Sequence, residues 1–173
     1  MTPPTDQRIG LLAGAGDIPL YFARKAAETG MRLVSVGFTE EIGTRLEPYV
    51  EKNYCIGVGR TSKIFSTLKS ENVQDLLILG KVDKSVIFRP QLFDLRSLKF
   101  LNQMRNNEDK TLMVGVIREL EKEGFRLLDQ RRLMPELFPP KGVLTRRRPS
   151  KEAWQDIEFG LPLAKKVADL EIG

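Results

Sequence analysis

Short apolar runs alternate with longer segments of helical periodicity through the first half of this 173-residue chain. Such runs predict buried strands, and apolar residues spaced by three and four positions predict helices. Consecutive parallel strands need a crossover of about a dozen residues, usually a helix, so this order favours a parallel sheet. The predicted strands cover residues 8–13, 31–36, 54–58 and 76–80, and the predicted helices cover residues 18–28, 40–50 and a segment capped by Thr61 or Ser62.

The second half of the chain has a different pattern. It predicts helices over residues 92–104 and 110–123, a short strand over residues 125–128 and a final helix capped by Ser150. Gly160 and Pro162 should kink or interrupt that final helix. We therefore expect an α/β fold, a Rossmann-like three-layer sandwich with a mainly parallel sheet and a C-terminal linker helix. Its expected parts are a flexible N-terminus at residues 1–7, one domain over residues 8–145 and a linker helix over residues 146–173.

A glycine-rich turn ends the first predicted strand and leads into the first predicted helix. It contains Gly14, Ala15, Gly16 and Asp17. Glycines let the backbone approach an anion closely, and a helix N-terminus offers unpaired N–H groups, so the turn is a candidate phosphate site. However, Pro19 stands where the dinucleotide-binding fingerprint has its third glycine, and Asp17 adds a negative charge. The alternative is an ordinary tight turn into a capped helix.

A second candidate site follows the fourth predicted strand, where Gly80, Lys81 and Val82 precede Arg89. The carboxyl ends of parallel strands form the ligand crevice of open α/β sheets. Gly80 would allow a close approach, and Lys81 and Arg89 would neutralise a phosphate group. The alternative is a surface loop with solvated charges.

Three other places have weaker patterns. The segment 57–60 follows the third predicted strand and is equally a turn or a ligand contact. Glu40 and Glu41 follow the second predicted strand, where a dinucleotide fold often holds a ribose-binding carboxylate. Asp109 precedes a helix, which favours a cap or a partner of the helix dipole over a metal or ribose ligand.

The composition restricts the chemistry that this chain can perform. It has no histidine and one cysteine, Cys55, which excludes Ser-His-Asp and Cys-His catalysis and histidine-based zinc sites. A hard cation held by oxygen atoms, such as Mg²⁺, is the metal that fits the remaining residue types. We expect Cys55 to lie in the core, and the absence of a disulfide within the chain is typical of a reducing compartment.

The net charge of +5 comes largely from Arg131, Arg132 and the arginines at 146–148. These residues are not interleaved with aromatic residues, so we expect no nucleic-acid partner. A solvated surface, an anionic membrane face or a phosphorylated ligand fits them better. No window approaches the ~18 apolar residues of a membrane span, and the polar N-terminus is unlike a signal peptide, so we expect a cytoplasmic protein.

Several segments, taken in order, resemble the N-terminal part of the LpxI-type UDP-2,3-diacylglucosamine pyrophosphatases. No single motif decides this, but the ordered set is fairly specific and runs from about Ile9 to the last residue. The segments are residues 12–19, 59–65, 80–84 with 89–90, 121–125, and 149–150 followed by 156–157.

The resemblance implies a protein of Gram-negative bacteria that lies peripherally on the inner membrane. Its family hydrolyses the pyrophosphate of UDP-2,3-diacylglucosamine to UMP and lipid X during lipid A synthesis, with Mg²⁺ or a similar ion. The substrate would lie between this Rossmann-like domain and a C-terminal domain that carries the catalytic acids. The resemblance therefore places no catalytic or metal-binding residue in this chain, and the chain alone is expected to be inactive.

On this interpretation the chain binds the nucleotide–pyrophosphate portion of the substrate. The expected binding residues are Gly14, Ala15, Gly16, Asp17, Gly80, Lys81, Val82, Arg89 and Asp109. The alternative is a free-standing Rossmann-like nucleotide-binding module or an NAD(P)-dependent regulatory domain. A face left exposed without the C-terminal domain also predicts self-association into a homodimer.

Overall fold

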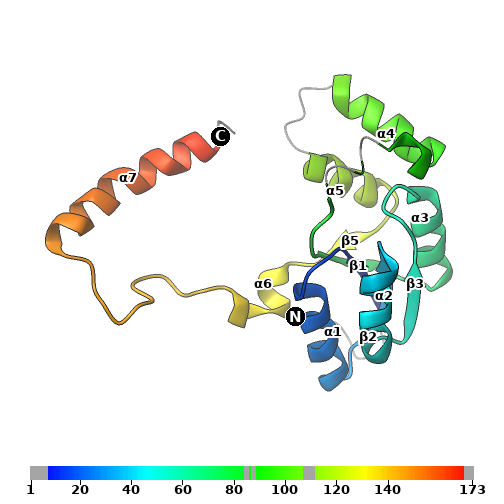
Figure 1. The fold of residues 1–173 in the computed structure, drawn as a ribbon, viewed down its shortest axis with the longest axis horizontal. Helices are drawn as coiled ribbons and strands as arrows, with labels where there is room; N and C mark the ends of the chain where they lie inside the picture. The colour runs from blue at the N-terminus through cyan, green and yellow to red at the C-terminus, as the bar shows by residue number, and fades with distance from the viewer. Residues whose placement is uncertain (1–7, 84–85, 87–88, 107–111, 170–173) are drawn as a thin grey trace. The chain divides into compact units, whose positions relative to one another are not determined.

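The computed structural model of this chain describes residues 8–83, 86, 89–106 and 112–169 (Figure 1). These residues fall into two compact units, one ending at Leu133 and the other beginning at Met134. The strands of the first unit are β1 (Arg8–Ala13), β2 (Arg32–Gly37), β3 (Lys52–Cys55), β4 (Asp75–Leu79) and β5 (Arg126–Leu127). Its helices are α1 (Ile18–Glu28), α2 (Glu40–Leu46), α3 (Thr61–Ser70), α4 (Leu95–Asn106), α5 (Leu112–Lys122) and α6 (Gln130–Leu133), with short 3-10 turns η1 (Glu47–Tyr49) and η3 (Pro90–Leu92).

The five strands form one parallel sheet in the order β3-β2-β1-β4-β5. From β1 the chain adds β2 and β3 on one side, then returns to place β4 on the other side of β1. The order of the strands therefore reverses between β1 and β4. In open α/β sheets, such a switch point leaves a crevice beyond the carboxyl ends of the two strands.

Both faces of the sheet are covered, which explains the unbroken apolar runs in β1 and β4. On one face Leu12, Val34 and Leu76 pack with Phe65 of α3 and Leu120 of α5. Alternate residues point to the opposite face, and α1 and α2 contact each other and β2. The predicted α/β, Rossmann-like fold is confirmed. The strand β1 and the helix α1 have the predicted bounds, and the ends of the other predicted elements of this unit differ by up to four residues.

One expectation about the core is wrong, because Cys55 is exposed. The third strand was expected over residues 54–58, but β3 ends at Cys55 and pairs only with β2 at the edge of the sheet. An edge strand has a neighbour on one side only, so it buries less of its surface than the central strands do. The apolar residue that follows, Ile56, is the buried one.

The second unit contains the 3-10 turn η4 (Pro135–Leu137) and one long helix, α7 (Lys151–Asp169). Ser150 caps α7 as expected, because its hydroxyl accepts a hydrogen bond from the Ala153 N–H at 3.2 Å. Helix α7 is not interrupted at Gly160 or Pro162, so of the two expected outcomes, a kink or an interruption, only the kink stays a prediction. No residue of α7 is buried, so water can reach the carbonyl group that proline leaves without a donor.

An ion-pair cluster holds the amino-terminal edge of the sheet. Glu51 accepts hydrogen bonds from Arg32 at 2.9 and 3.0 Å and from Arg8 at 2.5 Å, which links the starts of β1 and β2 to the residue before β3. The hydrogen bonds from Arg32 and Arg8 lower the pKa of Glu51 to about 2, from an ordinary 4.5. The ionised carboxylate therefore stabilises the folded state.

This cluster predicts acid sensitivity. Because the pKa of Glu51 is lower in the folded state, its stabilisation is complete above about pH 4.5 and is lost as the pH falls towards 2. The full shift corresponds to about 3 kcal/mol, which solvent screening reduces to about 1 kcal/mol. Urea unfolding of the native chain and of Glu51→Gln should show stabilities that differ at pH 7 and converge near pH 2. A difference that persists at pH 2 would contradict this assignment.

Candidate functional site

The loops that follow β1 and β4 lie against each other at the switch point of the sheet. The Ala15 N–H donates to the Lys81 carbonyl, and the Lys81 N–H donates to the Ala15 carbonyl, both at 2.8 Å. The Gly14 N–H donates to the Leu79 carbonyl, also at 2.8 Å. The sequence therefore placed both candidate loops correctly on the same rim, although they come from strands more than sixty residues apart.

This contact requires glycine at two positions. A Cβ atom on Gly14 would lie 2.4 Å from the Lys81 carbonyl oxygen, and one on Gly80 would lie 2.6 Å from the Gly14 carbonyl oxygen. Gly80 also has a φ of +87°, which residues with a side chain rarely adopt. The close approach that glycine permits here is between two segments of the protein's own backbone.

The hydrogen bonds decide which backbone groups could bind an anion. The N–H groups of Gly14, Ala15 and Lys81 are used in the contact between the loops. Within the described part of the chain, those of Gly16 and Asp17 make no hydrogen bond, and both residues are exposed at the start of α1. The donors available at this rim therefore lie at the α1 end of the loop, and of residues 14–16 only Gly16 keeps an N–H group for an anion.

Asp17 brings less negative charge to this rim than the sequence alone indicates. Its carboxylate forms an ion pair with Arg45 of α2 at 2.5 Å, and it makes no capping hydrogen bond to α1. Asp17 is exposed and Arg45 is partly exposed, so this is a solvated pair between the loop after β1 and helix α2. The pairing offsets the repulsion that a free Asp17 would exert on a phosphate group.

The remaining predicted binding residues are placed differently. Lys81 and Val82 are exposed beside the glycine loop. Arg89 is also exposed, and its N–H donates to the Val86 carbonyl at 2.9 Å, but no contact places its side chain on the two loops. Asp109 lies outside the described residues. The structure thus brings together Gly14, Ala15, Gly16, Asp17, Gly80, Lys81 and Val82.

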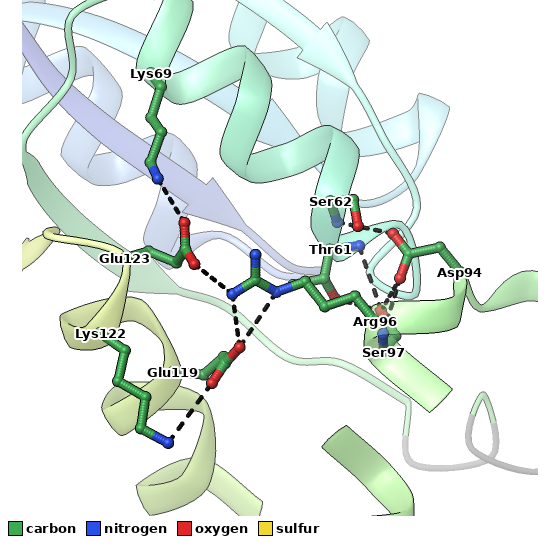
Figure 2. Close-up of polar contacts among 9 residues, drawn as sticks. All are labelled: Thr61, Ser62, Lys69, Asp94, Arg96, Ser97, Glu119, Lys122 and Glu123. Carbon is green, nitrogen blue, oxygen red and sulfur yellow. Dashed lines mark hydrogen bonds and ion pairs between the residues drawn. The ribbon is translucent and has the colours of Figure 1, made fainter. Parts of the chain in front are cut away.

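The loop at residues 57–60 is a structural junction, which supports the simpler interpretation of its sequence. A Cβ atom on Gly59 would lie 2.6 Å from the Leu92 carbonyl oxygen. The expected cap at Thr61 or Ser62 is wrong, because both residues lie inside α3. Instead, the Asp94 carboxylate accepts hydrogen bonds from the Ser62 N–H at 2.7 Å and the Ser97 N–H at 2.8 Å (Figure 2).

Asp94 therefore occupies the N-terminus of α3 with a charge of the protein's own. Partial burial raises the pKa of Asp94, but hydrogen bonds from the backbone N–H groups of Ser97 and Ser62 outweigh this effect and hold the pKa below its ordinary value. The carboxylate is thus ionised at neutral pH. An external phosphate at this helix end would have to displace it, so the first loop is the better candidate.

A second polar cluster, also in Figure 2, joins α3, α4 and α5. Arg96 of α4 donates to Glu119 at 2.7 Å and to Glu123 at 2.6 Å, and its guanidinium group lies 4.6 Å from the centre of the Phe65 ring. Lys69 of α3 pairs with Glu123 at 2.5 Å, and hydrogen bonds from Lys69 and Arg96 lower the pKa of Glu123. Its cations and acids satisfy one another, so this cluster holds helices together.

The sequence did not reveal that cluster. Glu119 lies in α5 and Glu123 directly follows its last residue, and their spacing of four positions was the available signal. Their partners come from two other helices, so the pairing is a tertiary property. Pairing with acids also removes Lys69 and Arg96 from the basic groups available to a ligand.

Two further features of the described residues concern the expected chemistry. No group of three or more Cys, Asp or Glu side chains lies close enough together there to hold a metal ion. Nor does any helix in that part of the chain combine the length and the apolar character needed to span a membrane.

Comparison with known proteins agrees with the family that the sequence resembles. A sequence model of the LpxI N-terminal domain matches residues 8–137. The chain is also 28% identical over 170 residues to the UDP-2,3-diacylglucosamine pyrophosphatase LpxI of Caulobacter vibrioides. That match covers 96% of this chain and 60% of the relative. The chain therefore belongs to the LpxI family and contains its N-terminal domain.

Proposed function

We propose that this chain is the substrate-binding N-terminal domain of a UDP-2,3-diacylglucosamine pyrophosphatase. The observation that carries the proposal is the joined pair of loops at the switch point, with free N–H groups at Gly16 and Asp17 beside the exposed Lys81. A diphosphate bridging a nucleoside and a sugar needs such a combination of backbone donors and a cation. The reaction would release UMP and lipid X, a step of lipid A synthesis.

In this proposal the chain binds and orients the substrate but does not supply the reacting acids. Hydrolysis of a pyrophosphate needs charge neutralisation by a metal and an activated water molecule. In this proposal the metal ion and the catalytic acids belong to the part of the relative that this chain does not span. Measurable hydrolysis of UDP-2,3-diacylglucosamine by this chain alone would contradict the proposal that the chain binds the substrate without supplying the reacting acids.

The direct test is calorimetric titration with UDP. Lys81→Ala should weaken UDP binding about tenfold, because one charge-assisted contact to the diphosphate is lost. The matched control is Lys52→Ala, which removes an exposed lysine at the start of β3, on the opposite edge of the sheet. Equal UDP affinities for Lys81→Ala and the native chain would overturn the site.

A free-standing NAD(P)-binding module is the second candidate, because dinucleotides also bind at such switch points. Pro19 is buried in the first turn of α1, at the place where the dinucleotide fingerprint has a glycine for close helix–strand packing. The same titration with NAD⁺ and NADP⁺ separates the candidates. Binding of either cofactor more tightly than UDP would favour the module.

A further inference from the structure

Asp17 departs from the usual behaviour of an aspartate at the start of a helix. Such a residue normally caps the helix by accepting a hydrogen bond from an N–H group of the first turn. Here its backbone is helical, with a φ of −95° and a ψ of −15°, and its carboxylate makes no capping hydrogen bond to α1. The carboxylate instead contacts Nη2 of Arg45 at 2.5 Å, in the neighbouring helix α2 (Figure 1). Its main partner is therefore a cation and not its own helix.

The sheet fixes the helix that carries Arg45. Ser35 of β2 is fully buried, and its hydroxyl donates to the side-chain oxygen of Asn53 at 2.6 Å. The Asn53 amide donates in turn to the Gly43 carbonyl of α2 at 2.8 Å. Leu46, directly after Arg45, is also fully buried. The backbone of α2 is thus held on both sides of Arg45, and a helical side chain leans towards the N-terminus of its helix, which for α2 lies at the carboxyl edge of the sheet.

Arg45 keeps donors that a ligand could use. A guanidinium group has five N–H donors in one plane. Within the part of the chain that the structure describes, one nitrogen of Arg45 donates to Asp17 and its side chain makes no other hydrogen bond. The side chains of Arg45 and Asp17 are 36% and 88% exposed. An exposed ion pair stabilises a protein only weakly, so the guanidinium group can turn towards a phosphate group, which arginine binds through paired N–H groups.

The charges around this pair favour an anionic ligand. The N-terminus of a helix has a partial positive charge, which disfavours a cation beside it. Lys81 adds a second cation, because its backbone is hydrogen-bonded to Ala15, two residues before Asp17. One carboxylate therefore accompanies two basic residues and the start of α1. A phosphate group would offset the excess positive charge.

We infer that Arg45 is a further phosphate-binding residue of the site, and that Asp17 is its positioning residue and not a contact to the substrate. This inference rests on the proposed function, since the ligand is the diphosphate of a UDP-sugar at the β1 and β4 loops. Arg45 keeps its bond to Asp17 and donates to a diphosphate oxygen with other N–H groups. No sequence motif marks Arg45, because its contact joins positions 28 residues apart.

The first test is calorimetric titration of the full chain with UDP and with inorganic pyrophosphate. Arg45→Ala should weaken the binding of both about tenfold, because one charge-assisted contact to the diphosphate is lost. The matched control is Arg24→Ala. Arg24 is an exposed arginine of α1 whose guanidinium group lies 5.3 Å from the centre of the Tyr49 ring. Its removal takes away the same charge and should leave both affinities unchanged.

The second test separates positioning from direct contact. Asp17→Asn alone should weaken UDP binding about threefold, because Arg45 is then no longer held beside the loop. In a chain that already has Arg45→Ala, the same change should instead strengthen UDP binding about threefold, since it only removes a negative charge near the phosphates. Circular dichroism should show that all variants are folded, because Asp17 gives α1 no cap and neither side chain of the pair is buried.

The outcomes distinguish the roles of the two residues. If Asp17→Asn weakens binding in both backgrounds, Asp17 contacts the ligand directly, and if it strengthens binding in both, Asp17 only repels the ligand; either result overturns the positioning role. Equal effects of Arg45→Ala and Arg24→Ala would overturn the role of Arg45.

The same titrations separate this inference from the proposed function. If Lys81→Ala weakens UDP binding but Arg45→Ala does not, this inference alone fails. If the native chain binds pyrophosphate through Arg45 but does not bind UDP, the proposed function alone fails. A native chain that binds neither ligand would overturn both.

Discussion

Replacing Gly14 by alanine should abolish UDP binding and destabilise the folded chain by about 3 kcal/mol. A Cβ atom at this position would lie 2.4 Å from the carbonyl oxygen and 2.9 Å from the nitrogen of Lys81. Both are backbone atoms held by hydrogen bonds to Ala15, so neither can move aside without breaking the contact between the loops. The change therefore separates the two segments that form the proposed site.

Gly57→Ala is the matched control for this substitution. Gly57 also lies in a loop after a strand, but a Cβ atom there meets nothing within 4 Å. Its stability should stay within about 0.5 kcal/mol of the native value, and its affinity for UDP should be unchanged. Urea unfolding and calorimetric titration of both variants measure the two effects. A stable, UDP-binding Gly14→Ala chain would show that the close contact between the loops is not needed.

Replacing Phe22 by alanine should destabilise the first unit by about 4 kcal/mol, a large part of the 5–15 kcal/mol that holds a typical domain folded. Phe22 is fully buried on α1, and its removal leaves a cavity that its neighbours can fill only partly. Helix α1 begins directly after the glycine loop, so loss of its packing should also let the backbone N–H groups of Gly16 and Asp17 move out of position.

Ile18→Ala is the control on the same helix. Ile18 is 50% exposed, so this truncation should cost less than about 1 kcal/mol. Urea unfolding monitored by far-UV circular dichroism gives the free energy of unfolding of each variant. If Phe22→Ala and Ile18→Ala lower the free energy of unfolding equally, the packing of α1 against the sheet does not depend on its buried face.

The secondary-structure predictions that the structure confirms rest on local sequence patterns. Apolar runs, glycine turns and helical spacing located β1, β2, β4 and the helices that join them, because backbone geometry makes these signals periodic within a few residues. The errors occurred where a neighbour in space decides. Cys55 is exposed because β3 is an edge strand, and the N-terminus of α3 is capped by Asp94, more than thirty residues further along.

The amino-acid sequence by itself determined the parallel α/β fold, the family and the two glycine loops that meet at one rim. The alternation of strands and helices along the chain was enough to place the two loops, since parallel strands bring their carboxyl ends to a common edge. Only the tertiary structure decided which groups at that rim are available. The loops use the N–H groups of Gly14, Ala15 and Lys81 to bind each other, and Arg45 pairs with Asp17. Hydrogen bonding between distant segments depends on distances that no local pattern encodes.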